Sequence, residues 1–352
     1  MKFRLPKDVA KKSIAYILSV VNESTVLVSS NKEHQKVAFE SASQGVYVRV
    51  NVPAVVESDG VVAIDGSQLS GIKFPVDVDI AATDGLLSFA SGTLRGSIHV
   101  VPVGGQIKAQ RPQGTPNSWV KIPKDQFLAA VNATVFSACM KGSIDGVTLR
   151  VENSTLIMHA FDAVRASLYS HPLDQAGEHR AVLATNFFSA MKKIPGDDIE
   201  LAFDPGSIRV RTPSAVMSYP TLQVETQDVY ADTMELLQTP CSGEFTVSAK
   251  RFGDAVSTVA SVLRGSMDFD TRIDFKVTDT SMDIALSSEH GQMRDSVALE
   301  GPVKACAFTL SGKHIADMLA LLNGDIRVRY YGSTVLFVSN DGHATVVLAT
   351  LA

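Results

Sequence analysis

The feature that most constrains this chain is an internal repeat, in which one order of elements recurs three times. Each repeat opens with a predicted strand, at Lys2–Leu5, Trp119–Ile122 and Glu244–Val247. A segment with apolar residues at helical spacing follows each strand, and strands of period two follow each helix. The helix-marking residues are Ile14, Ile17, Leu18 and Val21, then Phe127, Ala130, Val131, Thr134, Val135 and Ala138, then Val256, Val259, Ala260 and Leu263.

The second half of each repeat recurs as well. An apolar strand leads into a short helix at Val62–Ser67, Val182–Asn186 and Phe308–Gly312, and the Asp, Thr and Ser residues there are good helix N-caps. A strand, a glycine-containing turn and a second strand then match between Gly196–Thr212 and Gly324–Ser339. The agreement in order and spacing favours true repeats over three α+β domains that are similar by chance.

The repeats predict an α+β protein of three like domains, at residues 1–112, 113–240 and 241–352 of the 352-residue chain. The first boundary lies in the polar, Gly- and Pro-rich stretch Gly104–Ser118, and the second lies near Gln238–Gly243. A length of about 150 residues per domain also suggests two or three domains.

Composition narrows the class of protein. With 45% hydrophobic residues the chain is expected to be globular, and no apolar run approaches the ~18 residues of a membrane helix. The N-terminus has no apolar core of a signal peptide. The odd count of three cysteines (Cys139, Cys241 and Cys306) argues for a reducing compartment, so we expect a cytoplasmic protein.

Motifs for catalysis are missing from the sequence. Ser311–Lys313 resembles a phosphate loop, but Ala307 stands where that motif needs a glycine. Asp77 and Asp79 alternate along a strand, which favours a solvated strand face over a metal site. We therefore predict no catalytic residue, no metal and no cofactor, and the balance shifts to a binding or scaffold function.

Charge is distributed unevenly between the predicted helices and the rest of the chain. The six helical segments (7–21, 65–73, 124–141, 186–193, 250–264 and 312–322) carry +7, whereas the whole chain carries −5 and the remainder therefore −12. Helices on one surface would suit a phosphate backbone bound without sequence preference. The candidate DNA-binding residues are Lys7, Lys11, Lys12, Lys124, Lys141, Lys192, Lys193, Lys250, Arg251 and Arg264.

This ordered set of features resembles the bacterial-type (β) DNA polymerase sliding clamp over the whole chain. The opening Met1–Phe3, the helical stretch Ala133–Ser137 and the turn Ile144–Val147 are similar to that family. A Thr-Asp-Gly-His-Arg-Leu segment of the family corresponds to Phe161–Ala166, where only the Asp and the Arg match. The chain would thus be a divergent member, and a phage or another mobile element is one source that we consider.

The resemblance implies a homodimeric ring, with helices lining the interior and antiparallel sheets outside. Such a ring encircles double-stranded DNA, works with a clamp loader and tethers a DNA polymerase as a processivity factor, without being an enzyme. It would act on the nucleoid during replication, or in the host cytoplasm if a phage encodes it. The alternatives are a clamp-fold protein-binding scaffold that does not encircle DNA, and a three-domain enzyme whose site lacks recognisable motifs.

The resemblance also implies two protein-binding sites. A pocket for a partner peptide would lie between the second and third domains, lined by Ile144, Phe161, Asp162, Val164, Arg165, Val346, Val347 and Leu348. Val346–Leu348 could equally be plain core strand. The dimer interface would involve Leu94, Ile98, Val262, Leu263 and Met293.

Overall fold

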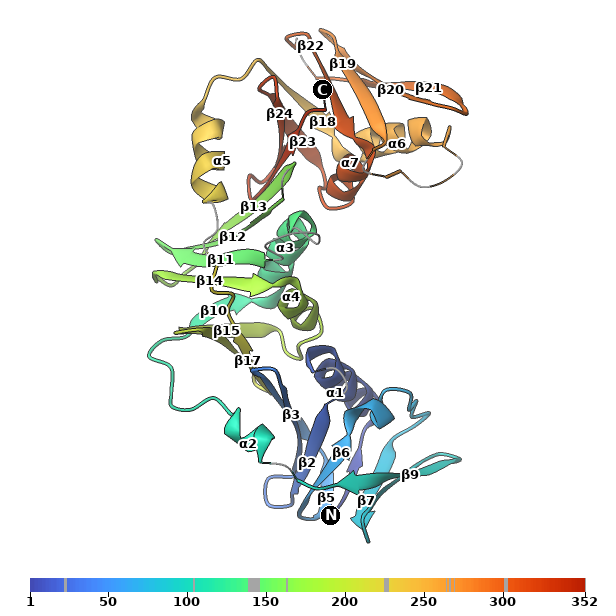
Figure 1. The fold of residues 1–352 in the computed structure, drawn as a ribbon, viewed down its shortest axis with the longest axis vertical. Helices are drawn as coiled ribbons and strands as arrows, with labels where there is room; N and C mark the ends of the chain where they lie inside the picture. The colour runs from blue at the N-terminus through green and yellow to red at the C-terminus, as the bar shows by residue number, and fades with distance from the viewer. Residues whose placement is uncertain are drawn as a thin grey trace. The chain divides into compact units, whose positions relative to one another are not determined.

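A computed structural model describes residues 1–21, 24–103, 105–138, 146–162, 164–224, 228–263, 265, 267–268, 270–300 and 303–351. Within them the chain forms seven α-helices and 25 strands (Figure 1), and the described strand pairs, such as β1 with β7 and β10 with β15, are antiparallel. This composition confirms the predicted α+β class.

The order of elements recurs three times. The first repeat comprises β1 (Lys2–Leu5), α1 (Lys7–Val20), β2 (Thr25–Asn31), β3 (Lys36–Ser43), β4 (Val46–Pro53), β5 (Val55–Ser58), β6 (Gly60–Asp65), the 3₁₀ helix η1 (Gly66–Leu69), β7 (Val78–Thr83), β8 (Leu86–Ser91) and β9 (Leu94–Val101). The second comprises β10 (Val120–Pro123), α3 (Lys124–Thr134), the 3₁₀ helix η2 (Val135–Ser137), β11 (Gly146–Glu152), β12 (Thr155–Phe161), β13 (Arg165–Pro172), β14 (His179–Ala184), α4 (Thr185–Met191), β15 (Asp198–Asp204), β16 (Ser207–Arg211) and β17 (Ala215–Pro220). The third comprises β18 (Gly243–Ser248), α6 (Ala249–Ala260), β19 (Arg272–Val277), β20 (Ser281–Ser288), β21 (Gly291–Ala298), β22 (Cys306–Ser311), α7 (Gly312–Leu319), β23 (Asp325–Tyr330), β24 (Thr334–Ser339) and β25 (Ala344–Ala349). Two further helices, α2 (Gln106–Ala109) and α5 (Val229–Gln238), lie between repeats.

The chain forms two compact units, which are residues 1–127 with 181–223, and residues 128–180 with 224–352. The first unit contains a 13-stranded sheet in the order β10-β15-β16-β17-β4-β3-β2-β6-β9-β8-β7-β1-β5. The other two sheets have the orders β14-β11-β12-β13-β25-β24-β23-β18 and β21-β20-β19-β22. Consecutive repeats share sheets because β4 pairs with β17 and β13 pairs with β25. The predicted boundaries at residues 112 and 240 therefore do not coincide with the compact units.

The opening strand and helix of each repeat fold as their apolar spacing predicts. In β1 the alternate residues Phe3 and Leu5 are buried, and in α1 the buried face includes Tyr16 and Ile17. Period-two and period-3.6 patterns each place apolar side chains on one face, so strand and helix can bury them against each other. The third repeat does the same, with Val247 buried in its opening strand.

Apart from the positions of helix ends, the helical predictions differ from the structure at three places. The segment 65–73 forms only the short helix η1, which Asp65 caps by accepting a hydrogen bond from the Ser67 amide at 2.9 Å. Helix α2 was not predicted, because it lies in the stretch Gly104–Ser118 interpreted as a domain boundary. Helix α5 was not predicted either, although nearly all of it precedes the second predicted boundary near Gln238–Gly243. Its N-cap is Asp228, whose side chain accepts a hydrogen bond from the Ala231 amide.

Strands β12 and β13 are covered on both faces. The buried residues of β12 are consecutive, from Leu156 to Ala160, as expected for a strand that packs on two sides. Helix η2, which continues α3, packs on one side of these strands and α5 on the other (Figure 1). No helix among the described residues is long and apolar enough to cross a membrane.

Candidate functional site

A hollow of about 260 Å³ opens in the second unit where β12, β13 and β25 end beside α5. Its walls are mostly apolar, with a few polar groups at the rim, which is the composition of a site for an apolar side chain held by a small number of hydrogen bonds. The lining residues are Phe161, Asp162, Val164, Arg165, Ala166, Val229, Asp232, Thr233, Leu236, Thr334, Val347 and Ala349.

The register between β13 and β25 decides which side chains face the hollow. Ala166 pairs with Val347, and both residues line the hollow, whereas Arg165 pairs with Leu348 on the opposite face of the sheet. Val346 and Leu348 are each only 1% exposed. Their side chains belong to the core, so of the predicted run Val346–Leu348 the hollow includes only Val347.

The structure thus brings together five of the eight residues predicted for the pocket. Phe161, Asp162, Val164, Arg165 and Val347 line one hollow. Ile144 lies outside the described residues, and Val346 and Leu348 lie in the core, as stated above. The wall formed by α5 was missed by the sequence reasoning.

Helix α5 supplies the wall opposite the strands, through Val229, Thr233 and Leu236. Its first turn is anchored to β11 because Arg150 Nη1 donates to both carboxylate oxygens of Asp228 at 3.0 Å. The Asp228 carboxyl has a lowered pKa, since the Ala231 amide and the Arg150 charge outweigh the opposing effect of burial. This anchor positions α5 over the sheet.

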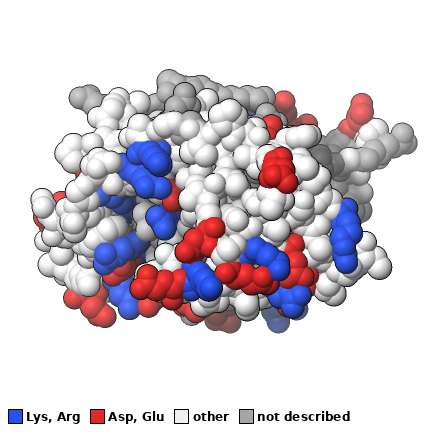
Figure 2. Space-filling model, turned by 90° about the horizontal axis from the view of Figure 1, so that it is seen from below, with Lys and Arg blue, Asp and Glu red and all other residues white. Residues whose placement is uncertain are grey.

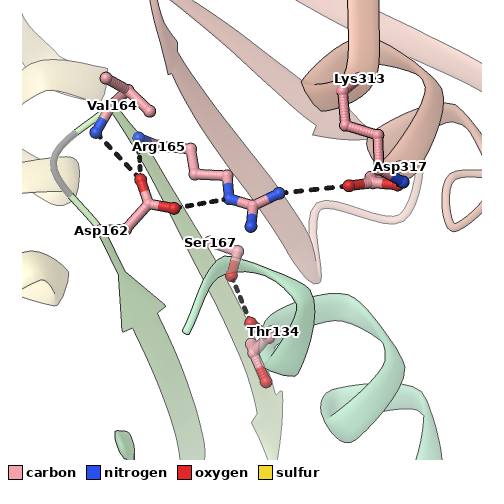
Figure 3. A network of polar contacts seen from close by, with 7 residues as sticks. All are labelled: Thr134, Asp162, Val164, Arg165, Ser167, Lys313 and Asp317. Atoms are coloured by element: carbon pink, nitrogen blue, oxygen red, sulfur yellow. Dashed lines mark hydrogen bonds and ion pairs between the residues drawn. The ribbon is translucent and has the colours of Figure 1, made fainter. Parts of the chain in front are cut away.

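Arg165 does not point into the hollow with its charged end. Its guanidinium donates from Nε to Asp162 Oδ2 at 2.9 Å and from Nη1 to Asp317 Oδ2 on α7 at 3.3 Å (Figure 3). It also lies over the Phe136 ring at 5.5 Å, and the side chain is 8% exposed. Two of its nitrogen atoms, Nε and Nη1, are thus engaged by carboxylates within the protein.

Strand β9 in the first unit and strand β21 in the second each leave an edge unpaired among the described strand pairs. Residues 94–99 of β9 pair with β8 on one side, and β6 pairs only with Val100 and Val101. Strand β21 is the edge of its four-stranded sheet. Of the residues predicted for a dimer interface, Leu94, Met293, Val262 and Leu263 are partly exposed, whereas Ile98 is 6% exposed and packs inside its own unit.

Comparison with known proteins gives a consistent result. No protein-family model matches the sequence, and no curated protein matches it either. Solved structures do match. The DNA polymerase sliding clamp from Bacillus subtilis has a TM-score of 0.84 at 18% identity and the match covers 100% of this chain and 99% of that chain. The DNA polymerase III β subunit from Thermotoga maritima has a TM-score of 0.81 at 15% identity, again over 100% and 99%. A sliding clamp from Pseudomonas aeruginosa bound to griselimycin has a TM-score of 0.84 at 15% identity, over 100% and 99%.

The chain has the fold of a bacterial β sliding clamp. The resemblance inferred from the repeats is thereby confirmed at the level of fold, and the low identities agree with a divergent sequence.

Consecutive repeats meet at two similar junctions, the first where β4 pairs with β17 and the second where β13 pairs with β25. The hollow lies at the second junction. At the first, β4 pairs with β17, and Tyr47 opposite Ser218 occupies the place that Ala166 has in the second. Tyr47 is 3% exposed, packs with Ile107 of α2, and donates its hydroxyl hydrogen to Glu40 at 3.0 Å. A large side chain therefore fills the first junction, whereas a small one leaves space at the second.

The basic residues predicted to contact DNA divide by exposure. Lys124 is partly buried, and its ammonium donates to the carbonyl oxygen of Ile194. Lys141 and Arg264 lie outside the described residues. The exposed members are Lys7, Lys11 and Lys12 on α1, Lys192 and Lys193 just after α4, and Lys250 and Arg251 on α6.

The summed charge of the helices is smaller than predicted. With the bounds of the structure the seven α-helices total +2. Lys192 and Lys193 follow α4, Lys141 and Arg264 lie outside the described residues, and α5 contributes −2 whereas α2 contributes +1. Figure 2 shows one face of the clamp fold, on which basic and acidic side chains lie side by side rather than in fields of one sign. In the first repeat, for example, Lys2 pairs with Glu57.

In the described part of the chain, no group of three or more His, Cys, Asp or Glu side chains is placed to hold a metal ion. The one strongly shifted histidine is His159 on β12, which is 1% exposed. Burial lowers the pKa of His159 to about 4, and neither ring nitrogen has a hydrogen-bond partner within the protein. The charges of Asp228, Arg150 and Arg180 act on this pKa as well, but burial is the largest cause of the shift.

Proposed function

We propose that this protein is a DNA sliding clamp: a homodimeric ring that encircles double-stranded DNA and tethers a DNA polymerase through a peptide seated in the hollow. It would need a clamp loader to be placed on DNA, and it would act as a processivity factor in the cytoplasm without catalysing a reaction. The observation that supports this proposal most is the hollow where β13 pairs with β25. It lies in a chain that matches clamp structures over its full length. Within this proposal the three domains keep the predicted ranges 1–112, 113–240 and 241–352.

The hollow supports a peptide as the partner. Burying apolar side chains against Ala166, Val347 and Leu236 contributes about 25 cal/mol per Å², and the rim can orient a peptide backbone through Thr334. The Pseudomonas aeruginosa clamp binds griselimycin. We propose that the same compound binds the hollow of this chain and serves as a probe for it.

The two open edges support a ring of two copies. The open part of β9, residues 94–99, and the eight residues of β21 are long enough for the edge of one copy to pair with the edge of the other. Two such contacts, related by a two-fold axis, close a dimer and leave no exposed strand edge at either place. Leu94 and Met293 are partly exposed on these strands and would be buried in the contact.

The exposed lysines support electrostatic contact with DNA. Lys11, Lys12 and Lys250 carry long, solvated charges on helices, and such side chains bind phosphates without reading sequence. A second candidate function is a clamp-fold scaffold that binds proteins and does not encircle DNA. The total helical charge of only +2 favours this alternative, because it is small for a surface that binds phosphates.

Primer extension tests the proposal and separates the two candidates. A singly primed circular template is copied by the replicative polymerase and clamp loader of the same cell, with and without the protein. A sliding clamp lengthens the products several-fold in wild type and fails to do so in Val347→Arg, which fills the hollow. A scaffold leaves the product length the same with wild type, with Val347→Arg and without the protein. That result would contradict the proposed function.

A further inference from the structure

The connection from β12 to β13 forms part of the rim of the hollow, and one carboxylate shapes it. Asp162 Oδ1 accepts hydrogen bonds from the Val164 amide at 2.9 Å and from the Arg165 amide at 3.0 Å. Val164 stands at the rim with a 42% exposed side chain. The place of this apolar wall therefore depends on where the Asp162 carboxylate is held.

The guanidinium of Arg165 holds that carboxylate from the opposite face of the sheet. Ser167, two residues along β13, points to the same face as Arg165 and donates to the carbonyl oxygen of Thr134, which fixes this face as the one beneath α3 (Figure 3). From there Arg165 spans the two carboxylates of Asp162 and Asp317. Residue 317 is 152 positions away in sequence and lies on α7, in the third repeat.

Resting on the proposed peptide-binding role, we propose that Arg165 is a positioning residue, which holds the Val164 rim in its binding shape from behind the hollow with Asp317 as its anchor. The planar fork of arginine can join two carboxylates at once, which the point charge of lysine does poorly. Because the rim already has its binding geometry, no conformational entropy is lost in ordering that loop when a ligand binds. A partner thus meets a preformed wall, with the guanidinium buried behind it.

Asp317 offers a way to disturb this arrangement without touching the hollow. Its Oδ2 accepts from Arg165, and its Oδ1 accepts from Lys313 Nζ at 2.5 Å within α7. Asp317→Asn removes the charge that anchors Arg165. Lys313→Gln is the matched control, because it removes the other ion pair of the same carboxylate and leaves the link to Arg165 in place.

The first measurement is griselimycin affinity by calorimetry for wild type, Arg165→Lys, Asp317→Asn, their double variant and Lys313→Gln. We expect each of the first two substitutions to weaken binding about five- to tenfold, the double variant to lose less than a further twofold, and Lys313→Gln to bind as wild type. If Arg165→Lys weakens binding while Asp317→Asn does not, Arg165 contacts the ligand directly and the positioning role is wrong.

The second measurement needs no ligand and keeps the two proposals apart. Hydrogen exchange at the amides of Val164 and Arg165 should become about fivefold faster in Asp317→Asn and stay unchanged in Lys313→Gln. A lower urea midpoint with unchanged exchange at these amides would mean a general structural role and would overturn the inference. Should wild type fail to bind griselimycin, the proposed use of the hollow is contradicted, and the exchange result alone decides the role of Arg165.

Discussion

Val347 and Leu348 are neighbours on β25 with opposite roles, which a pair of substitutions can separate. Val347 faces the hollow, so Val347→Arg should lower griselimycin affinity at least tenfold, or about 1.4 kcal/mol, with little change in stability. Leu348 is 1% exposed, so Leu348→Ala should cost about 2–5 kcal/mol of stability and leave affinity within twofold. Calorimetry and urea unfolding give the two quantities, and equal effects of both variants on affinity would place the hollow elsewhere.

The buried His159 should make the free energy of unfolding depend on pH. Its folded pKa is about 4, below the ordinary value near 6.5, so on acidification the unfolded chain takes up a proton first. Stability should fall by up to roughly 3 kcal/mol as the pH drops from about 6.5 to about 4, and this loss should level off below that. His159→Leu should remove this component, so its gain in stability over wild type should grow steadily as the pH falls from 7.5 to 4.5. Urea midpoints between pH 4.5 and 7.5 check it, and identical pH profiles for the two proteins would refute it.

The sequence could not assign side chains at the site, for reasons visible in single residues. Val346, Val347 and Leu348 are all apolar, so alternation alone cannot say which of them faces the core, and only the register with Ala166 decides. The role of Arg165 depends on Asp317, whose proximity is a consequence of the tertiary fold. The Asp and Arg that match the family, Asp162 and Arg165, nonetheless lie in the lining of the hollow.

Among the elements, α5 determines whether the hollow has a second wall. Asp228→Ala removes both the N-cap of α5 and the partner of Arg150, so the first turn should loosen by about 1 kcal/mol. Hydrogen exchange of the α5 amides should become several-fold faster, and griselimycin should bind more weakly. Glu235→Ala, an exposed change on the same helix, is the control. Unchanged exchange in the first variant would show that packing alone holds α5.

The strands and helices inside the repeats were predictable because their apolar residues follow period two or 3.6 over several turns. The ten residues of α5 follow the last strand of the second repeat and have an acidic, mixed sequence. They are held in place by the Arg150 anchor and by packing on β12 and β13. Tertiary contacts of this kind leave no periodic signal strong enough to distinguish a short helix from a boundary.

For the whole molecule, the ring predicts a dimer of about 75 kDa, twice the 37.6 kDa chain. The Val100 amide bonds back to Gly85, so the Ser97 amide, three residues away on β9, points to the open edge. Ser97→Pro should therefore give monomers without loss of an internal hydrogen bond. Ser97→Ala, which keeps the amide, should stay dimeric. Sedimentation velocity at micromolar concentration measures both, and a monomeric wild type would refute the ring.

DNA contact should be additive and sensitive to salt. A variant with Lys11→Glu, Lys12→Glu and Lys250→Glu should be lost from DNA at lower salt than wild type, and the slope of log affinity against log salt should fall by about 0.9 for each phosphate contact removed. Lys36→Glu with Lys276→Glu, two exposed changes on strands, is the control. Binding of the triple variant at wild-type strength would exclude a basic helical surface.

Encirclement of DNA is the central claim, and linearising a loaded circle tests it most directly. The protein is placed on nicked circular DNA with a clamp loader, freed of unbound protein by gel filtration, and divided into samples with and without a restriction enzyme that cuts the circle once. The ring predicts that the protein stays on intact circles and slides off the linear product. Equal retention on circular and linear DNA, or none on either, would contradict it.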